Sequence, residues 1–197
     1  MIAIINYNAG NIASVANALE RLGFEYIVTR DPKTILRTDK VIFPGQGRAG
    51  AAMSELRKTG IDKIIPQLTK PFLGICLGMQ LLAQCSEEDR TKCLGIFPGA
   101  CRKFPPTLKT PHLGWNKVAL KRNSPLTAGI PDGSYFYFVH SYYVDAPTAK
   151  QIIGETSYGF DFPSIMQKDN FFAVQFHPEK SGEQGRRLLN NFCGLCL

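Results

Sequence analysis

The 197-residue sequence contains no long hydrophobic run. Its apolar stretches fall well short of the roughly 18 residues that a membrane-spanning helix requires, so we expect no membrane association. Residues 1–6 also lack the basic start and the longer apolar stretch of a secretory signal peptide. Cysteine is sparse as well, because six cysteines are too few to form a disulfide scaffold in a chain of this length. These absences predict a cytoplasmic protein with reduced thiols.

Motifs for cofactors and nucleic acids are missing too. Cys193 and Cys196 have the C-x-x-C spacing of a zinc site, but no second pair in the sequence matches them. The loop at 44–47 lacks the Lys-Ser/Thr of a phosphate-binding loop. No DNA-reading motif is visible, and the basic clusters lack the interleaved aromatic residues of a single-strand binder. We therefore predict no metal, no cofactor and no nucleic-acid partner.

Acidic residues are absent from one long segment, residues 90–131, which carries eight basic residues. The net charge of +7 would by itself suggest an anionic partner. Outside this segment, however, 15 basic residues stand against 16 acidic ones, so the rest of the chain is close to neutral. The charge therefore marks one basic segment and not a basic protein.

The first half of the chain alternates strand-like and helix-like patterns, and the second half is rich in strands. Asn11 can cap a helix whose apolar residues recur at helical spacing. Strand–helix alternation predicts parallel strands with helices on both faces of the sheet. The expected strands are Ile2–Ile5, 26–28, Lys40–Phe43, 71–75, 117–120, 135–144, 151–155, 165–167 and 172–176; the expected helices are 12–22, 49–58, 77–84 and 182–192. The sequence thus predicts one α/β domain over residues 1–197, with a central mixed, mainly parallel sheet flanked by helices in a flavodoxin-like arrangement.

Residues 74–78, Gly-Ile-Cys-Leu-Gly, match the nucleophile elbow, with an expected strand before Cys76 and an expected helix after it. In such a turn the nucleophile occupies a strained corner, and the glycines on either side let the neighbouring elements approach closely. The helix that begins near Leu77 points its positive end at the sulfur, which favours the thiolate. The alternative is a buried cysteine that serves packing only.

A second candidate, His177-Pro178-Glu179, follows the apolar segment 171–176. In an extended chain His177 and Glu179 point to the same side, so the carboxylate can orient the imidazole. Together with Cys76 they would form a nucleophile, a base and an orienting group. Taken alone, the segment is more typical of a capping histidine beside a surface glutamate, and only its pairing with the elbow reverses this preference. By contrast, His140 lies in an aromatic segment, and we interpret it as a hydrogen-bonded structural residue.

Taken together, these motifs make the chain resemble the class I, triad-type glutamine amidotransferases. The resemblance extends over essentially the whole chain, and within the family it is greatest to glutaminase subunits that pass ammonia to a (βα)8-barrel cyclase in histidine biosynthesis. It rests on Tyr7, Gly10, Asn11, Ser14, Val15, Pro44, Gly45, Gly47, residues 74–80, residues 86–88, residues 111–116, residues 137–142 and residues 175–181.

The resemblance implies a glutaminase reaction and a role for each matching residue. Cys76 would attack the side-chain amide of glutamine, His177 would act as base and then acid, and Glu179 would orient His177. Three further sets follow from the family: an oxyanion hole from Leu77 and the Gly45-Gln46-Gly47 peptide; a glutamine-binding set of Gly45, Gln80, Glu88, Ser141 and Tyr142; and a partner interface of Asn11, Pro111, His112, Trp115 and Asn116.

Two residues depart from the family pattern, because Gln46 replaces a residue that is commonly valine and Asn8 replaces a usual glycine. Three alternatives stay open at this point: a paralogue that serves another ammonia acceptor, a non-catalytic regulatory protein on the same fold, and a cysteine hydrolase that acts without a partner. We also expect part of the basic segment 90–131 to face an acidic rim on the partner, with a solvated loop as the alternative.

Overall fold

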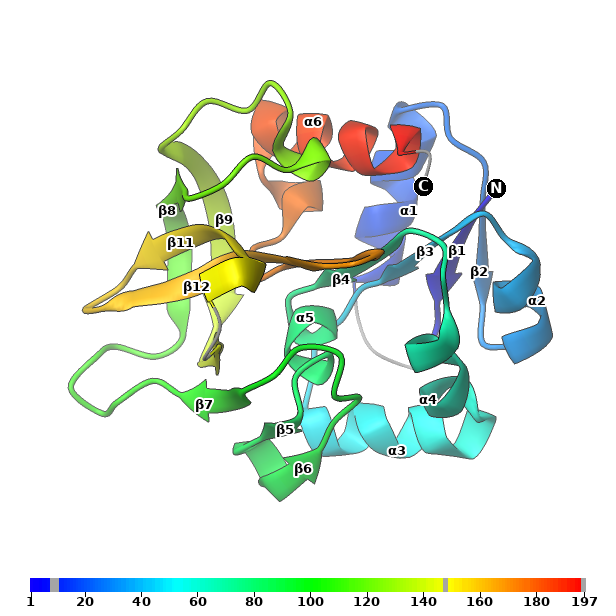
Figure 1. The fold of residues 1–197 in the computed structure, drawn as a ribbon, viewed down its shortest axis with the longest axis horizontal. Helices are drawn as coiled ribbons and strands as arrows, with labels where there is room; N and C mark the ends of the chain where they lie inside the picture. The colour runs from blue at the N-terminus through cyan, green and yellow to red at the C-terminus, as the bar shows by residue number, and fades with distance from the viewer. Residues whose placement is uncertain (8–10, 147–148, 196–197) are drawn as a thin grey trace.

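In the computed structural model, which describes residues 1–7, 11–146 and 149–195, a nine-stranded sheet forms the centre of the domain (Figure 1). Its strand order is β2-β1-β3-β4-β13-β12-β11-β8-β9. The strands are β1 (Ile2–Ile5), β2 (Tyr26–Thr29), β3 (Lys40–Phe43), β4 (Phe72–Ile75), β8 (His112–Leu120), β9 (Ser134–His140), β11 (Ile152–Ser157), β12 (Asp161–Lys168) and β13 (Phe171–Val174).

The sheet has a parallel half and an antiparallel half. Strands β2, β1, β3, β4 and β13 pair in parallel, in the 2-1-3-4-5 order of flavodoxin-like folds. From β13 through β12, β11 and β8 to β9, every pairing is antiparallel. The expected mixed sheet is confirmed, but "mainly parallel" overstates it, because hairpins from the second half of the chain extend the sheet by four antiparallel pairings.

A second, small sheet escaped prediction. It contains β5 (Cys85–Ser86), β6 (Thr91–Lys92), β7 (Ala100–Lys103) and β10 (Tyr142–Asp145) in the order β10-β7-β5-β6. The single strand expected at 135–144 is therefore wrong. His140 still pairs with His112 in the large sheet, whereas Tyr142 already pairs with Lys103 in the small one. The chain changes sheets at Ser141, whose carbonyl accepts a hydrogen bond from the Phe104 N–H at 3.1 Å.

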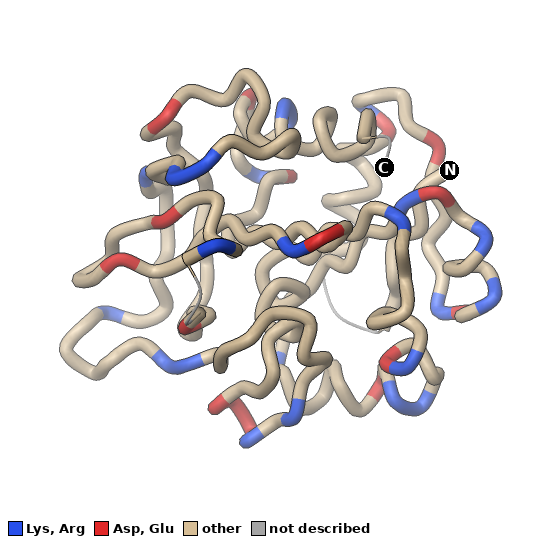
Figure 2. The backbone as a smooth tube through the Cα atoms, viewed as in Figure 1, with Lys and Arg blue, Asp and Glu red and all other residues tan. Residues whose placement is uncertain are grey.

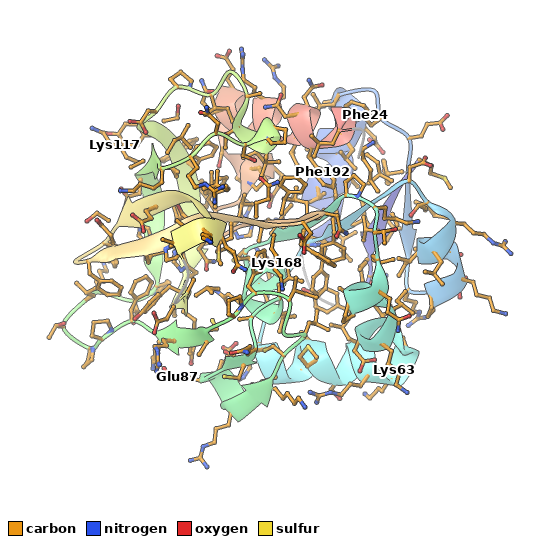
Figure 3. The ribbon with its side chains drawn as sticks, viewed as in Figure 1. Phe24, Lys63, Glu87, Lys117, Lys168 and Phe192 are labelled. Atoms are coloured by element: carbon orange, nitrogen blue, oxygen red, sulfur yellow. The ribbon has the colours of Figure 1, made fainter. Side chains whose placement is uncertain are left out.

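Helices cover both faces of the large sheet, as the alternation predicted. The helices are α1 (Ile12–Arg21), α2 (Pro32–Arg37), α3 (Ala49–Thr59), α4 (Ile61–Ile64), α5 (Leu77–Leu81) and α6 (Gly182–Gly194), with 3-10 turns at Ile65–Gln67, Glu88–Arg90, Pro125–Thr127, Ala149–Gln151 and Pro178–Lys180. One core cluster joins α1 and α6 to one face, and another joins α3 and α5 to the opposite face. Figure 3 shows Phe192 of α6 directed at the sheet and Lys63 of α4 at the outside.

Local chemistry explains two helix starts differently from the sequence prediction. Asn11 does not cap α1 through its side chain, because its backbone is left-handed (φ 77°) and its amide is used elsewhere. Helix α2, which escaped prediction, is capped by Asp31, whose carboxylate accepts hydrogen bonds from the Lys33 and Thr34 N–H groups. Within the described ranges, no helix combines the length and the hydropathy needed to cross a lipid bilayer.

The basic segment is partly neutralised within the chain. Arg102 forms ion pairs with Glu87 (3.2 Å) and Asp145 (2.7 Å), and Lys121 lies 3.1 Å from Glu155. Figure 2 shows acidic residues interspersed among the basic ones across the molecule. Folding therefore supplies acidic neighbours that the segment itself lacks.

Candidate active site

Cys76 occupies the corner between β4 and α5. Its φ of 53° is unusual for a residue with a side chain, and such strain is typical of functional positions. A Cβ on Gly74 would lie 3.0 Å from the carbonyl carbon of Gly78, and one on Gly78 would overlap the Phe43 carbonyl oxygen. The strained corner and the close passage that the elbow motif predicted are both confirmed.

His177 reaches the cysteine because their strands are neighbours. β4 and β13 pair in parallel with Ile75 opposite Val174, so the residues that follow both strands meet at one edge of the sheet. His177 Nδ1 lies 2.7 Å from Glu179 Oε1, and both side chains are almost completely buried. Burial alone would lower the pKa of His177, but Cys76 and Glu179 outweigh it and raise that pKa above its ordinary value. A protonated imidazole beside a carboxylate and a sulfur is the charge arrangement of a cysteine–histidine pair.

The other ring nitrogen of His177, Nε2, is buried and has no hydrogen-bond partner among the described residues. This leaves Nε2 available to exchange a proton, while Nδ1 is held by Glu179. Asn11 adds a further contact, since its amide Nδ2 donates to Glu179 Oε1 and lies 3.3 Å from His177 Nδ1. Asn11, which the resemblance placed at the partner interface, therefore contacts the His177–Glu179 pair through its side chain.

The loop after β3 packs directly on the start of α5. Tyr7 Oη donates to the Pro44 carbonyl at 2.7 Å, and a Cβ on Gly45 would lie 2.9 Å from Leu77 Cβ. Gly47 has a φ of 123°, a conformation that favours glycine. The structure thus brings the 45–47 peptide and Leu77 together beside Cys76, which is the placement that the oxyanion-hole hypothesis requires.

A pocket of about 410 Å³ opens at Cys76, large enough for an amino acid. Four of the five predicted glutamine-binding residues line it, whereas Gly45 is not among the lining residues and packs against Leu77. The lining residues are Gln46, Gly47, Cys76, Leu77, Gln80, Glu88, Pro111, Val139, His140, Ser141 and Tyr142. Glu88 is held by the first N–H of α3, because its Oε2 accepts from Ala49 N at 2.7 Å.

The predicted interface residues divide into exposed and buried ones. Trp115 is 56% exposed on the outer face of β8, beside Leu113 at 63%, whereas His112 is only 3% exposed. The His112 side chain therefore offers almost no surface to a partner, because β8 alternates and turns this ring into the core. Asn116 is half-buried, and Pro111 is exposed at the rim of the pocket. Asn8, Gly10 and Cys196 lie outside the described residues.

Two residues at the site belong to the motifs of the resemblance but were assigned no role from the sequence. Gln175 is fully buried, and its Nε2 lies 3.7 Å from Cys76 Sγ. Tyr7 anchors the 44–47 loop, and burial, followed by the neighbouring Cys76, raises the pKa of its phenol. For Gln175 a signal was present, since an amide at the end of an apolar core strand needs hydrogen-bond partners.

The parallel core, the strained cysteine and its buried His–Glu partner define a triad-type amidotransferase or hydrolase. The chain belongs to the glutamine amidotransferase class I family, whose model matches residues 3–195. It is 48% identical to the imidazole glycerol phosphate synthase subunit HisH of Bacteroides thetaiotaomicron over 98% of this chain and 99% of that protein. It is 50% identical to the subunit of the same name from Methanocaldococcus jannaschii, over 99% of this chain and all of that protein.

Solved structures agree on the fold. A crystal structure of a glutamine amidotransferase matches with a TM-score of 0.76 and 17% identity, over 99% of this chain and all of that chain. PurLQS from Thermotoga maritima matches with a TM-score of 0.75 and 18% identity, over 97% of this chain and 96% of that chain. These likenesses concern architecture alone.

Proposed function

We propose that this protein is the glutaminase subunit of an imidazole glycerol phosphate synthase. It would hydrolyse L-glutamine to glutamate and ammonia and pass the ammonia to a cyclase partner, which makes imidazole glycerol phosphate and an aminoimidazole carboxamide ribotide in histidine biosynthesis. The observation that carries the proposal is Cys76 in the wall of an amino-acid-sized pocket, with the buried His177–Glu179 pair beside its sulfur. The HisH relatives, which match over nearly their full length, support the choice of acceptor.

The geometry supplies the first half of the reaction. The Cys76 sulfur attacks the amide carbon of glutamine, and the carbonyl oxygen becomes an oxyanion that the Leu77 N–H and the 45–47 peptide can stabilise. His177 then donates its Nε2 proton to the departing amine, and ammonia leaves a γ-glutamyl thioester on Cys76. Glu179 keeps Nδ1 protonated and thus directs Nε2 toward the reacting atoms.

The second half releases glutamate. A water molecule gives a proton to His177 Nε2 as its oxygen attacks the thioester, and the sulfur departs as thiolate. The pocket holds the amino-acid end of the substrate through the Glu88 carboxylate, the Gln80 amide and the backbone at Ser141 and Tyr142. A carboxylate at Glu88 suits the ammonium group of glutamine.

The partner would be a (βα)8-barrel cyclase that docks on the outer face of the β8–β9 hairpin. Leu113, Trp115 and Tyr135 expose more than half of their side chains there. Exposed aromatic residues on one face are typical of protein interfaces. Two cations lie on the same face, since Lys117 Nζ is 5.5 Å from the Tyr135 ring centroid and Lys180 Nζ is 5.9 Å from that of Tyr137. We propose that these positive charges meet an acidic rim on the cyclase, in the cytoplasm.

Glutamate release from glutamine tests the proposal. It is measured for the protein alone and with the barrel cyclase and its nucleotide substrate. We expect slow release alone, a large rise with both, and no release from Cys76→Ala under either condition. Fast turnover without the partner would refute the dependence on a cyclase, and activity of Cys76→Ala would refute the mechanism.

A further inference from the structure

Gln175 contacts the nucleophile but has no part in the mechanism above. It follows β13, two residues before His177, and its backbone N–H donates to the Ser164 carbonyl at 3.0 Å. Its side chain is completely buried, with Nε2 at 3.7 Å from Cys76 Sγ. This distance is within the range of an N–H donor to sulfur, whose acceptor distances exceed those of oxygen. Gln175 does not line the glutamine pocket, so its contact is with the sulfur and not with the substrate site.

The orientation of the Gln175 amide decides what the sulfur meets. An amide has a donor end and an acceptor end, and only the donor end stabilises a negative sulfur. Gln80 Nε2 lies 3.1 Å from Gln175 Oε1 and donates to it. The oxygen of Gln175 therefore faces Gln80, and its NH2 group faces Cys76.

The amide of Gln80 is fixed in turn. Its Nε2 also donates to the Tyr142 carbonyl at 2.9 Å, so both of its hydrogens are used on acceptors. A flipped Gln80 would place its oxygen against two oxygens. Because Gln80 is 5% exposed, water cannot readily replace the lost hydrogen bonds.

The Tyr142 carbonyl has a second donor, His140, whose Nδ1 lies 2.7 Å away. Because this nitrogen must carry a hydrogen, Nε2 of the neutral ring is an acceptor, and it takes the hydrogen of His112 Nδ1 at 3.0 Å. His112 Nε2 then accepts from Asn116 Nδ2 at 3.1 Å, and the same Nδ2 donates to the Ser157 carbonyl at 3.0 Å. Burial lowers the pKa of His112 to about 4 and that of His140 to about 3, which agrees with two neutral rings.

We propose that Gln175 is a further catalytic residue of the glutaminase, whose side-chain N–H stabilises the Cys76 thiolate, and that Gln80, His140 and His112 are positioning residues that fix its orientation. The catalytic role of Gln175 rests on the proposed glutaminase function, whereas its contact with the Cys76 sulfur rests on the hydrogen bonds described above. The thiolate exists before attack and returns when the thioester breaks, so the same N–H assists both steps. A hydrogen bond to a charged acceptor is worth about a tenfold change in such an equilibrium.

The first experiment measures thiolate formation and needs neither glutamine nor partner. Each variant is alkylated with iodoacetamide between pH 5 and 10, and modification of Cys76 is quantified by peptide mass spectrometry. The exposed Cys85 in the same molecule is the internal reference. The measured quantity is the Cys76 midpoint, the pH at which the alkylation rate of Cys76 reaches half its maximum. In Gln175→Leu, which keeps the side-chain volume and removes the N–H donor, we expect this midpoint to rise by about one pH unit. Gln175→Glu, which offers only acceptors when ionised, should raise it further, and Cys85 should not change.

An unchanged Cys76 midpoint in both variants would overturn the proposal, and circular dichroism confirms that each variant is folded. If Gln175→Leu does not fold, Gln175→Glu alone decides. Steady-state glutaminase assays with the cyclase give the second readout: kcat should fall about tenfold while KM stays within about threefold, because Gln175 does not line the pocket. If Gln175→Leu has the kcat of the wild type, the role of Gln175 is refuted and the glutaminase function stands. If the wild type releases no glutamate, the glutaminase function is refuted and the alkylation result is unaffected.

The positioning part is tested at His112. Without the His112 N–H, His140 Nε2 loses its donor, so His112 no longer fixes the Nδ1–H tautomer that donates to the Tyr142 carbonyl. His112→Phe should therefore raise the Cys76 midpoint and lower kcat, and His112→Asn, whose Nδ2 replaces the lost donor, should restore most of both. The chain has three histidines, so ¹⁵N spectra resolve each ring. We expect Nδ1–H tautomers for His112 and His140; an Nε2–H tautomer at His140 in the wild type, or a His112→Phe midpoint equal to the wild type, would overturn the positioning role.

Discussion

Two buried histidines should make the fold sensitive to mild acid. His112 is 3% exposed and His140 is 5% exposed. Burial lowers the pKa of His112 to about 4; for His140 burial outweighs the hydrogen bond to Tyr142, and the pKa falls to about 3. In the unfolded chain both rings titrate near pH 6.5. The unfolded state therefore binds protons below pH 6.5 that the folded state does not bind, and stability falls as the pH falls from 6.5 toward 4.

The magnitude follows from the size of this window. Between pH 7 and pH 5 each histidine removes about 2 kcal/mol from the free energy of unfolding, since one pKa unit corresponds to about 1.4 kcal/mol. His177 acts in the opposite direction, because its pKa is raised in the folded state. The stabilisation from His177 is fully present below pH 6.5 and mostly present at pH 7. Between pH 7 and pH 5 it therefore adds less than about 1 kcal/mol to the free energy of unfolding. The net loss from the three histidines is about 3 kcal/mol.

Urea unfolding at pH 7, 6 and 5 measures this loss, with His112→Asn as the matched variant. Asparagine keeps a donor near the Nδ1 position but does not titrate. The variant should lose about 2 kcal/mol less than the wild type between pH 7 and pH 5. Equal losses in the two proteins would refute the reasoning, as would an NMR titration of the wild type in which His112 protonates above pH 6.

Three further predictions concern the elbow, the triad and the partner surface. Gly78→Ala should destabilise the protein by about 3 kcal/mol in urea unfolding, because the new Cβ would overlap the backbone carbonyl of Phe43. Gly194→Ala is the control and should not destabilise the protein, because a Cβ there meets nothing within 4 Å. Similar stabilities of the two variants would contradict the packing argument. Glu179→Gln should lower kcat on the order of a thousandfold and lower the pKa of His177, and a glutaminase assay with a His177 titration checks both effects. Charge reversal of Lys103, Lys109 and Lys117 together should slow association with the cyclase and change its salt dependence in stopped-flow measurements, and an unchanged association rate would favour a solvated basic loop.

Local patterns predicted the parts of the fold that depend on local forces. A short apolar run such as Ile2–Ile5 predicts a strand that is buried on both faces. The two glycines of Gly-x-Cys-x-Gly predict the tight turn at Cys76. The small sheet could not be found this way, because β5 and β6 contain two residues each, too few to show a periodic pattern, and form only by pairing with each other and with β7. The break at Ser141 is likewise tertiary, since it depends on which sheet each half of the segment joins.

Site residues follow the same division. Cys76 and His177 were predictable because each sits directly after a core strand, and neighbouring parallel strands end at the same edge. Asn11 was misassigned since an asparagine before a helix is a normal cap, and only the folded chain shows its amide at Glu179. The resemblance placed His112 at the partner interface together with the rest of residues 111–116. Strand alternation, however, directs its ring into the core.

Strand β9 connects the exposed face to both reacting groups. On its outward side it carries Tyr135 and Tyr137, whose ring packs edge-on against Trp115 at 6.1 Å. Its backbone lies against both Cys76 and His177, because the Tyr137 carbonyl accepts from the His177 N–H at 2.9 Å and the Val139 carbonyl oxygen lies 3.9 Å from Cys76 Sγ. The strand is followed by Ser141 and Tyr142, which form one wall of the pocket at Cys76. A partner that shifted this face would displace the contact of Cys76, the anchor of His177 and the pocket wall together, so the proposed dependence of the glutaminase on its partner would require no separate signalling route through the core.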